Sequence, residues 1–151
     1  MAETGAKFVL IGGHAVSAHG YERATTDVDI VYSTALEHCT RMVHALGEID
    51  ATVTMADTPP PAGSITPEWL AAGGHFMFHT ECGPLHALSW VSGLDYADLD
   101  SRAQTAELAD GTLVRVCSYG DLVTMKRQAG RPRDRVDLRE LEAVREEQDI
   151  P

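Results

Sequence analysis

The chain has 151 residues, of which 44% are hydrophobic and 23% charged, which excludes overall disorder and leaves no room for several domains of about 150 residues each. Its net charge of -11 disfavours non-specific DNA binding, and no apolar run approaches the roughly 20 residues of a membrane-spanning helix. Because we find no signal-peptide pattern, we expect a cytoplasmic protein with one domain over residues 1–151 and no membrane partner.

The first predicted element is a short buried strand. Residues 8–11 form an apolar run that ends at Gly12 and Gly13, a pattern typical of a strand that enters a tight turn. A short helix is expected over 14–19, and Gly20 would end it.

The β-branched run 28–32 predicts a second strand, and Asp27 and Asp29 lie at its start. Because side chains alternate between the two faces of a strand, residues two positions apart share one face. The two carboxylates should therefore project together.

A longer helix is predicted next, over 36–46, from the helical spacing of its apolar residues. Thr34 and Glu37 match a capping box at its start, and Gly47 suits the position just beyond its last turn.

The rest of the chain predicts further strands and two helices. The strands are expected at 48–55, 75–80, 85–91 and 113–117, with a surface loop over 58–64 and a turn at 81–84. The helices are expected from 119 to a break at 130–132 and from 133 to 146, before an end that should fray, with these residues facing inward: Val136, Leu138, Leu141 and Val144. The elements predict an α+β fold, a mixed β-sheet of about four to six strands with helices mainly on one face. The last two helices should close a cleft in front of Asp27 and Asp29.

Basic residues are unevenly distributed. Five of the twelve Lys and Arg residues lie within ten positions: Lys126, Arg127, Arg131, Arg133 and Arg135. An acidic protein therefore carries one local basic patch that could bind a compact anion. The cysteines, in contrast, show no C-x-x-C spacing, and we expect reduced, buried thiols at Cys39, Cys82 and Cys117.

The diglycine turn and the acidic strand together predict a site for a metal-bound phosphate. Asp27 and Asp29 supply hard oxygen ligands that suit Mg²⁺. Gly12 and Gly13 open a short helix with exposed backbone N–H groups, which attract phosphate. Taken alone, an Asp-x-Asp pair is commonly surface charge, and a Gly-Gly pair is commonly an ordinary turn.

In this order and spacing, residues 9–32 resemble the nucleotidyltransferase superfamily of the DNA polymerase β type. The resemblance includes an Arg-x-Thr-x-Asp-x-Asp segment at Arg23, Thr25, Asp27 and Asp29. It implies a nucleotidyltransferase-like sheet flanked by helices.

The C-terminal part adds a second similarity. Asp121 is followed by Lys126 and then by Arg131, Asp134 and Asp137, which is similar to the C-terminal signature of the AbiEii-like and related nucleotidyltransferase groups. Members of such groups include toxin or antitoxin components, so the resemblance implies a possible cognate toxin or antitoxin partner.

The resemblance implies transfer of a nucleoside monophosphate from an NTP to a hydroxyl of a protein, tRNA or small molecule. Asp27 and Asp29 would hold Mg²⁺ against the triphosphate, and Lys126 would neutralise the leaving pyrophosphate. The implied nucleotide-binding residues are Gly12, Gly13, Arg23, Thr25, Lys126, Arg131 and Asp134.

One departure concerns the third carboxylate that the superfamily usually supplies from a neighbouring strand. Here that strand carries His86, which could act as a catalytic base but is a poorer partner for Mg²⁺ than an oxygen ligand. Glu81, Asp95 or Asp98 would substitute if the strand register differs.

The histidines offer a competing metal site. Five of them could gather around a transition metal, at positions 14, 19, 75, 79 and 86, although no H-E-x-x-H spacing occurs. His75 and His79 share one strand face but should lie about 13 Å apart, too far to bind one ion.

Three hypotheses follow. The first is an Mg²⁺-dependent nucleotidyltransferase of the AbiEii-like kind, in which Asp27, Asp29, Lys126 and His86 are the candidate catalytic residues. The second is a catalytically impaired nucleotide- or partner-binding domain that lacks the third carboxylate. The third is an antibiotic-modifying nucleotidyltransferase whose acceptor site is built by the 59–69 loop and the C-terminal helices.

Overall fold

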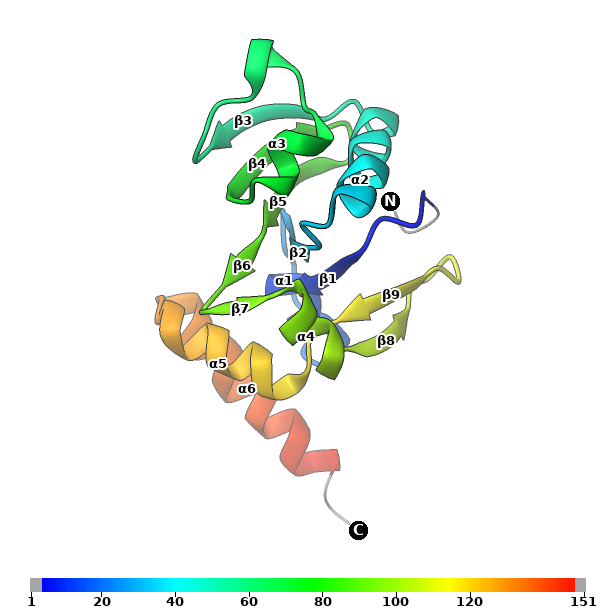
Figure 1. Ribbon diagram of the computed structural model, residues 1–151. Coiled ribbons are helices and arrows are strands. Elements are labelled where there is room, and N and C mark those ends of the chain that lie inside the picture. The colour runs from blue at the N-terminus through cyan, green and yellow to red at the C-terminus, as the bar shows by residue number, and fades with distance from the viewer. Residues whose placement is uncertain (1–3, 149–151) are drawn as a thin grey trace.

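The structure, a computed structural model, describes residues 4–148 (Figure 1). Its strands are β1 (Phe8–Ile11), β2 (Val28–Tyr32), β3 (Thr52–Ala56), β4 (His75–Thr80), β5 (Gly83–Leu88), β6 (Trp90–Val91), β7 (Leu94–Asp95), β8 (Gln104–Glu107) and β9 (Leu113–Val116). Its helices are α1 (Gly12–Ala18), α2 (Leu36–Glu48), α3 (Pro67–Ala71), α4 (Tyr96–Arg102), α5 (Tyr119–Ala129) and α6 (Pro132–Gln148), and a 3-10 turn, η2, covers Pro61–Gly63. Among the described residues, no helix is both long and apolar enough to span a bilayer.

Seven strands form one mixed sheet in the order β3-β4-β5-β2-β1-β9-β8, and β6 and β7 form a separate ribbon. β2 pairs in parallel with β5, and β1 with β9, while the other pairs of the main sheet are antiparallel. The expected α+β class and mixed sheet are confirmed. The sheet is wider than the expected four to six strands because β8, which has no apolar alternation, adds to its edge as the partner of β9.

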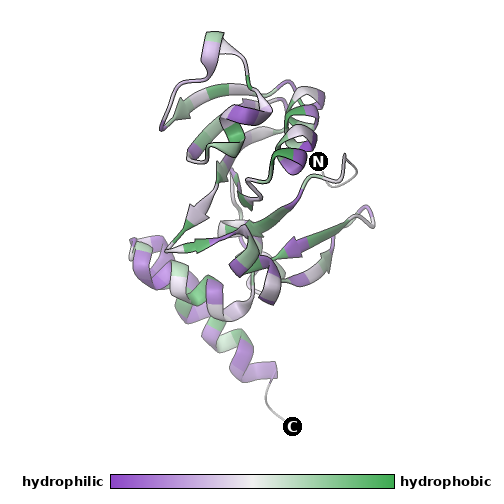
Figure 2. Ribbon diagram, in the orientation of Figure 1, coloured by the Kyte–Doolittle hydropathy of each residue, from purple (hydrophilic) through white to green (hydrophobic). Residues whose placement is uncertain are grey.

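Helices cover both faces of the sheet, which corrects the expectation that they lie mainly on one. Along β2, Ile30 and Tyr32 pack in a core with residues of α2 and α3, while Val31 packs on the other face with residues of α1, α4, α5 and α6. Strands buried on both faces read as continuous apolar runs, which explains the sequence of β1. Figure 2 shows the hydrophobic colour concentrated in these central strands.

Two predicted helix ends differ from the structure. The capping box of Thr34 and Glu37 is wrong, because α2 has Ala35 as its N-cap with no side-chain cap hydrogen bond. Gly47 lies inside α2, which continues to Glu48, so the strand predicted from 48 begins only at Thr52. At the diglycine turn, α1 starts at Gly12 itself rather than at residue 14.

Short elements account for the remaining differences. The strand predicted over 85–91 ends at Leu88, because the chain leaves the sheet at Ser89, whose hydroxyl accepts a hydrogen bond from the Gly74 N–H. The helices α3 and α4 and the strand β8 were not predicted, since none has a long apolar period. Of the end expected to fray, 148–151, Gln148 still belongs to α6, and 149–151 lie outside the described residues.

The last helix, α6, has only part of the predicted apolar face. Leu141 is buried and Leu138 and Val144 are half-buried, but Val136 is exposed. Beside Leu141, Asp134 and Asp137 are also buried on this helix. Figure 2 shows α6 as mostly hydrophilic, so polar contacts must hold it against the rest of the molecule.

Candidate active site

A cleft of about 550 Å³ lies between the sheet and the C-terminal helices. All of the site residues named from the sequence line this cleft: Gly12, Gly13, Arg23, Thr25, Asp27, Asp29, His86, Lys126, Arg131 and Asp134. They come from chain segments more than a hundred positions apart, and the fold brings them to one place.

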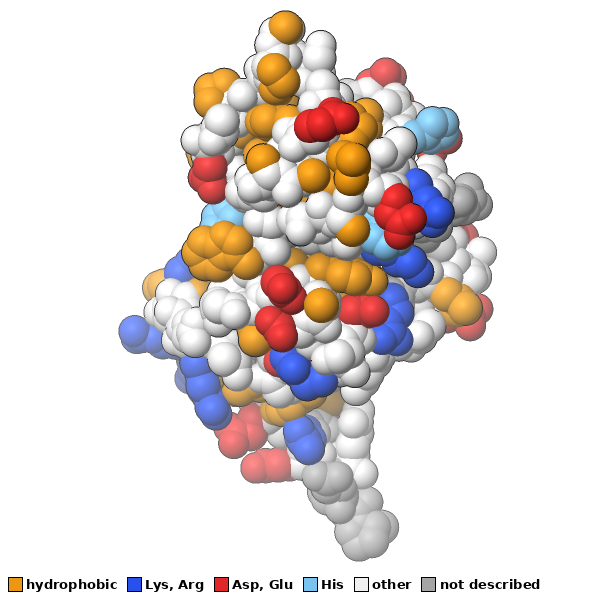
Figure 3. All heavy atoms as spheres, in the orientation of Figure 1, with side chains coloured by type: hydrophobic (Ala, Val, Ile, Leu, Met, Phe, Trp, Pro, Cys, Tyr) orange, Lys and Arg blue, Asp and Glu red, His pale blue; other side chains and the backbone are white. Residues whose placement is uncertain are grey.

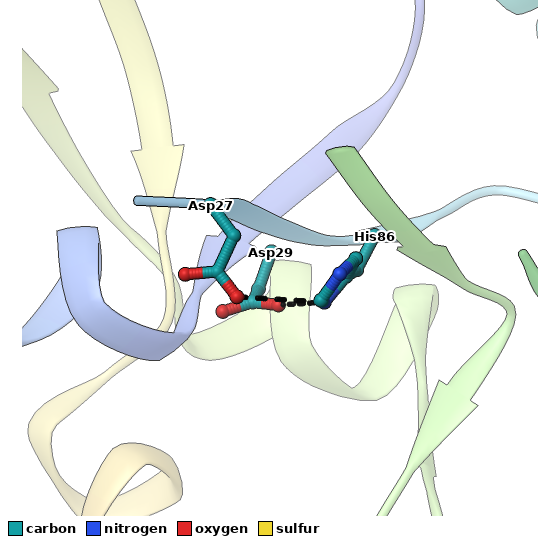
Figure 4. A group of neighbouring side chains, drawn as sticks. All are labelled: Asp27, Asp29 and His86. Atoms are coloured by element: carbon teal, nitrogen blue, oxygen red, sulfur yellow. Dashed lines mark hydrogen bonds and ion pairs between the residues drawn. The ribbon is translucent and has the colours of Figure 1, made fainter. Parts of the chain in front are cut away.

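The strand register sets the acidic side of the cleft. Asp29 on β2 pairs with Ile11 at the end of β1 on one side and with His86 on β5 on the other. The Nδ1 atom of His86 is 2.9 Å from Oδ1 of Asp29 and 3.7 Å from Oδ2 of Asp27. Figure 4 shows the three side chains pointing toward one another from the two strands. His86 therefore lies beside the acidic pair, as the parallel register of β2 and β5 requires.

The two glycines allow the first turn of α1 to lie against the acidic strand. Gly12 has a φ of +64°, and a Cβ there would overlap the carboxylate of Asp29. A Cβ on Gly13 would lie 2.6 Å from Oγ1 of Thr25 and 3.2 Å from Nη1 of Arg23. A side chain at either position would push the turn away from the strand.

The charge of Asp29 is disfavoured by its surroundings. Burial and the neighbouring Asp27 raise the pKa of Asp29 above its ordinary value, although His86 and Lys126 act in the opposite direction. A cation bound between the two carboxylates would relieve this cost. The ligand atoms of Asp27, Asp29 and His86 lie within 4.8 Å of one another, so these residues fit a shared divalent ion.

The cations on the basic side of the cleft are paired with two buried carboxylates. Lys126 Nζ is 2.9 Å from Asp134 Oδ1 and 2.8 Å from Asp137 Oδ2. Arg23 donates two hydrogen bonds to Asp137, of 2.6 and 2.8 Å, and Arg131 Nε is 2.7 Å from Asp134. The cations expected to meet phosphate are thus held in place by ion pairs.

Helix geometry explains this network. Gly130 ends α5 in the left-handed conformation, and α6 begins two residues later. Asp134 and Asp137 are three positions apart and so share one face of α6, which they present to Lys126. Burial raises the pKa of both carboxyls, but hydrogen bonds from the basic side chains outweigh it and hold each pKa below its ordinary value.

Asp137 is the residue of the network that had no role assigned from the sequence. It was part of the C-terminal similarity, yet its burial and its link to Arg23, 114 positions away, depend on the fold. A usable signal was present, because two aspartates at helical i, i+3 spacing in an otherwise polar helix indicate a shared cationic partner.

Several alternatives named from the sequence lie away from the cleft. Asp95 and Asp98 form the capping box of α4, and Glu81 is exposed in the turn between β4 and β5. The 59–69 loop does not line the cleft either, and Met55 and Asp57 at the end of β3 take its place.

The competing histidine cluster does not form among residues 4–148, where Asp27, Asp29 and His86 are the one group of three or more potential metal ligands. The cysteines are free, and Cys39 and Cys117 are buried as expected, but Cys82 is exposed in the β4–β5 turn. Burial raises the pKa of the Cys39 thiol to about 11, which makes it a poor nucleophile.

No protein-family model and no curated protein sequence matches the chain significantly. Solved structures, in contrast, do match the chain. The Thermotoga maritima protein TM1012, described as a candidate nucleotidyltransferase, aligns with a TM-score of 0.55 at 15% identity over 89% of this chain and 80% of its own. The antibiotic-resistance factor ANT(2'')-Ia aligns with a TM-score of 0.51 at 15% identity over 95% of this chain and 82% of its own. The chain therefore has the nucleotidyltransferase-like fold, with the acidic pair, the diglycine turn and the C-terminal lysine in one cleft.

Proposed function

We propose that the protein is a divalent-metal-dependent nucleotidyltransferase that transfers a nucleoside monophosphate from an NTP to a hydroxyl acceptor. The observation that carries the proposal is the meeting of Asp27, Asp29, Gly12 and Lys126 in one cleft. This combination offers ligands for a metal and donors for a triphosphate, which are the two requirements of the reaction.

Each residue has a distinct part in the proposed reaction. Asp27 and Asp29 would hold the metal, expected from the resemblance to be Mg²⁺, which when bound would polarise the phosphate oxygens. Gly12 and Gly13 would let phosphate oxygens approach the backbone without a Cβ in the way. Arg23 and Thr25, which lie close to Gly13 and line the same cleft, would orient this turn and contact the nucleotide.

Lys126 would stabilise the leaving pyrophosphate as a fixed charge. An ammonium group has three donors, and two of those of Lys126 are directed to Asp134 and Asp137. One donor remains for a ligand in the cleft. Arg131, held by Asp134 at the rim, would contact the same phosphates.

A second candidate function is supported by the same site. The resemblance implies that His86 stands where relatives have a third carboxylate, and Lys126 is already paired, so we also propose a catalytically impaired nucleotide- or partner-binding domain as the alternative. An antibiotic-modifying activity, suggested by the likeness to ANT(2'')-Ia, is a third possibility for the acceptor.

The test separates binding from transfer. Thermal stabilisation by each NTP with Mg²⁺ or Mn²⁺ should be seen for the wild type and lost in the variant with Asp27→Asn and Asp29→Asn. Glu140→Gln, at an exposed position of α6, is the matched control and should respond as the wild type does. No response to any metal–NTP pair would contradict both the transferase and the impaired-binder hypotheses.

Transfer is tested with α-labelled NTPs and three acceptor classes: protein, tRNA and aminoglycosides or lincosamides. Stable label on an acceptor supports the enzyme, whereas binding without label supports the impaired domain. Further proposals from the resemblance are membership of the AbiEii-like group and a toxin–antitoxin role with a cognate protein partner. From length and composition we also propose one domain over residues 1–151 and a cytoplasmic location. Co-purification of one small partner protein would test the toxin–antitoxin role.

A further inference from the structure

The ligand atoms offered to a metal in the cleft do not form an all-oxygen set. Asp27 and Asp29 supply carboxylate oxygens, but the third atom near them is the imidazole Nδ1 of His86. We infer that these residues form a three-ligand centre that binds Mn²⁺, Co²⁺ or Zn²⁺ in preference to Mg²⁺. The inference deepens the proposed function, since it concerns the metal of the same cleft.

The distances suit direct coordination by His86. Two ligand atoms that each lie about 2.1 Å from one ion are about 3.0 Å apart in an octahedral complex and about 3.4 Å apart in a tetrahedral one. They cannot be more than about 4.2 Å apart at those bond lengths. The separations of Nδ1 from the two carboxylates, 2.9 and 3.7 Å, fall inside this limit. One ion could therefore contact His86 together with either carboxylate, and the three ligand atoms all lie within 4.8 Å of one another.

The position of His86 is set by the sheet rather than by a mobile loop. β5 pairs in parallel with β2 through four successive residue pairs, of which Asp29 with His86 is one. The side chains of Asp27, Asp29 and His86 are 31, 22 and 26% exposed, so solvent or substrate oxygens could complete the coordination. Figure 4 shows the imidazole directed at both carboxylates rather than away from them.

The chemistry of the donor atoms then determines the choice of ion. Mg²⁺ requires near-octahedral oxygen coordination, and nitrogen is a weak ligand for it. Zn²⁺ and Co²⁺ accept imidazole and carboxylate together, and Mn²⁺ accepts carboxylate with some imidazole. A histidine in place of a third carboxylate should therefore weaken the binding of Mg²⁺ relative to that of Mn²⁺, Co²⁺ and Zn²⁺.

A different role for His86 is an outcome of the test. If the imidazole donates its Nδ1 proton to Asp29 and only orients that carboxylate, the metal would be bound by oxygen alone. The ion preference would then be that of two carboxylates and would not depend on the histidine.

The experiment measures metal binding without nucleotide. The wild type is titrated with Mn²⁺, followed by electron paramagnetic resonance, and with Co²⁺, followed by visible absorption, each in competition with Mg²⁺. Pulsed electron paramagnetic resonance of the Mn²⁺ complex detects hyperfine coupling to ¹⁴N when an imidazole nitrogen is a ligand. We expect that coupling, and a preference for Mn²⁺ and Co²⁺ over Mg²⁺ of at least about tenfold.

His86→Asp should abolish the ¹⁴N coupling and reduce the preference by about tenfold or more, because it restores an all-oxygen set. His79→Asp, at an exposed position of the adjacent strand β4, is the matched control and should keep both. Absence of ¹⁴N coupling in the wild type, with an unchanged preference in His86→Asp, would overturn the inference.

The two proposals fail separately. Nucleotide transfer with Mg²⁺ but without a histidine-bound metal would retain the proposed function and reject the inference. A histidine-bound metal without transfer to any acceptor would retain the inference and favour the impaired domain.

Discussion

The two sides of the cleft carry opposite charges and stabilise them in different ways. The acidic side, Asp27 and Asp29, is partly exposed; His86 contacts both carboxylates, and the Thr25 hydroxyl donates a hydrogen bond to Asp27. The basic side, Lys126 and its neighbours on the helices, is paired with Asp134 and Asp137, whose side chains are 1 and 0% exposed. The pKa of Asp29 is accordingly raised, whereas those of the two helix aspartates are lowered.

This difference indicates which charges need a ligand. The acidic side keeps two carboxylates together at a cost, and a bound cation would offset that cost. The cations of the basic side are paired within the protein, and their ion pairs also hold α6 in place. Figure 3 shows Lys and Arg side chains on the surface over the α5–α6 region. Charge on the acidic side is thus available for a ligand, whereas charge on the basic side also stabilises the fold.

The largest expected effect is the loss of the buried network. Asp137→Asn removes the charge that pairs with both Arg23 and Lys126, so that two cations with little solvent access share one buried carboxylate fewer, Asp134 remaining with Lys126. We expect a decrease of about 3–5 kcal/mol in the free energy of unfolding, measured with urea. Asp100→Asn, which breaks the more exposed pair with Arg115, should cost no more than about 1 kcal/mol. Equal costs in the two variants would show that the network is not a folding element.

A smaller effect is expected at the turn that faces the acidic side. Gly12→Ala should destabilise the fold by about 1–3 kcal/mol, because its backbone is left-handed and its Cβ would meet Asp29. The affinity for a metal should also decrease, because Asp29 must move to make room for the added Cβ. Gly47→Ala, inside α2 with no atom near the added Cβ, should instead stabilise by about 0.5–1 kcal/mol. Thermal unfolding of both variants checks the contrast, which fails if both change in the same direction.

The smallest effects are expected in the pH dependence, and they have opposite signs on the two sides. Asp134 and Asp137, with lowered pKa values, contribute stability that is present above the unfolded value of about 3.9 and is lost as the pH falls through the folded value. Asp29 has a raised pKa, so its ionisation lowers the stability as the pH rises from about 3.9 through the folded value. Asp27 contributes to this raised pKa, whereas His86 and Lys126 act against it.

Asp29→Asn should therefore be more stable than the wild type at pH 7, by up to about 1 kcal/mol, and the gain should vanish in acid. The loss caused by Asp137→Asn should shrink in acid instead. Urea unfolding at a series of pH values measures both trends. A gain for Asp29→Asn that persists in acid would indicate a packing effect rather than a charge effect.

Local patterns predicted the elements that carry the site. The apolar run of β1 with its two glycines, the β-branched strand β2 and the break at Gly130 depend on neighbouring residues, so the sequence is sufficient to place them. The α+β class followed from the same patterns. Elements without a long period were missed: β8 is stabilised by its pairing with β9, and α4 is a helix of only seven residues.

The errors in α6 have a tertiary cause. Its apolar residues predicted an inward face with Val136, but the observed inward face carries Asp134 and Asp137. Those carboxylates are buried because Lys126 and Arg23 reach them from other segments of the chain. The spacing of apolar residues cannot predict the inward face of a helix that is held by ion pairs.

The sequence by itself determined most of the candidate site residues and the order in which they occur, because a diglycine turn, an acidic strand and a basic tail are local features. Only the tertiary structure decided that His86 lies opposite Asp29 and that buried aspartates neutralise Lys126. Strand register and ion pairing join residues far apart in the chain, and their free energy depends on contacts that no local pattern contains.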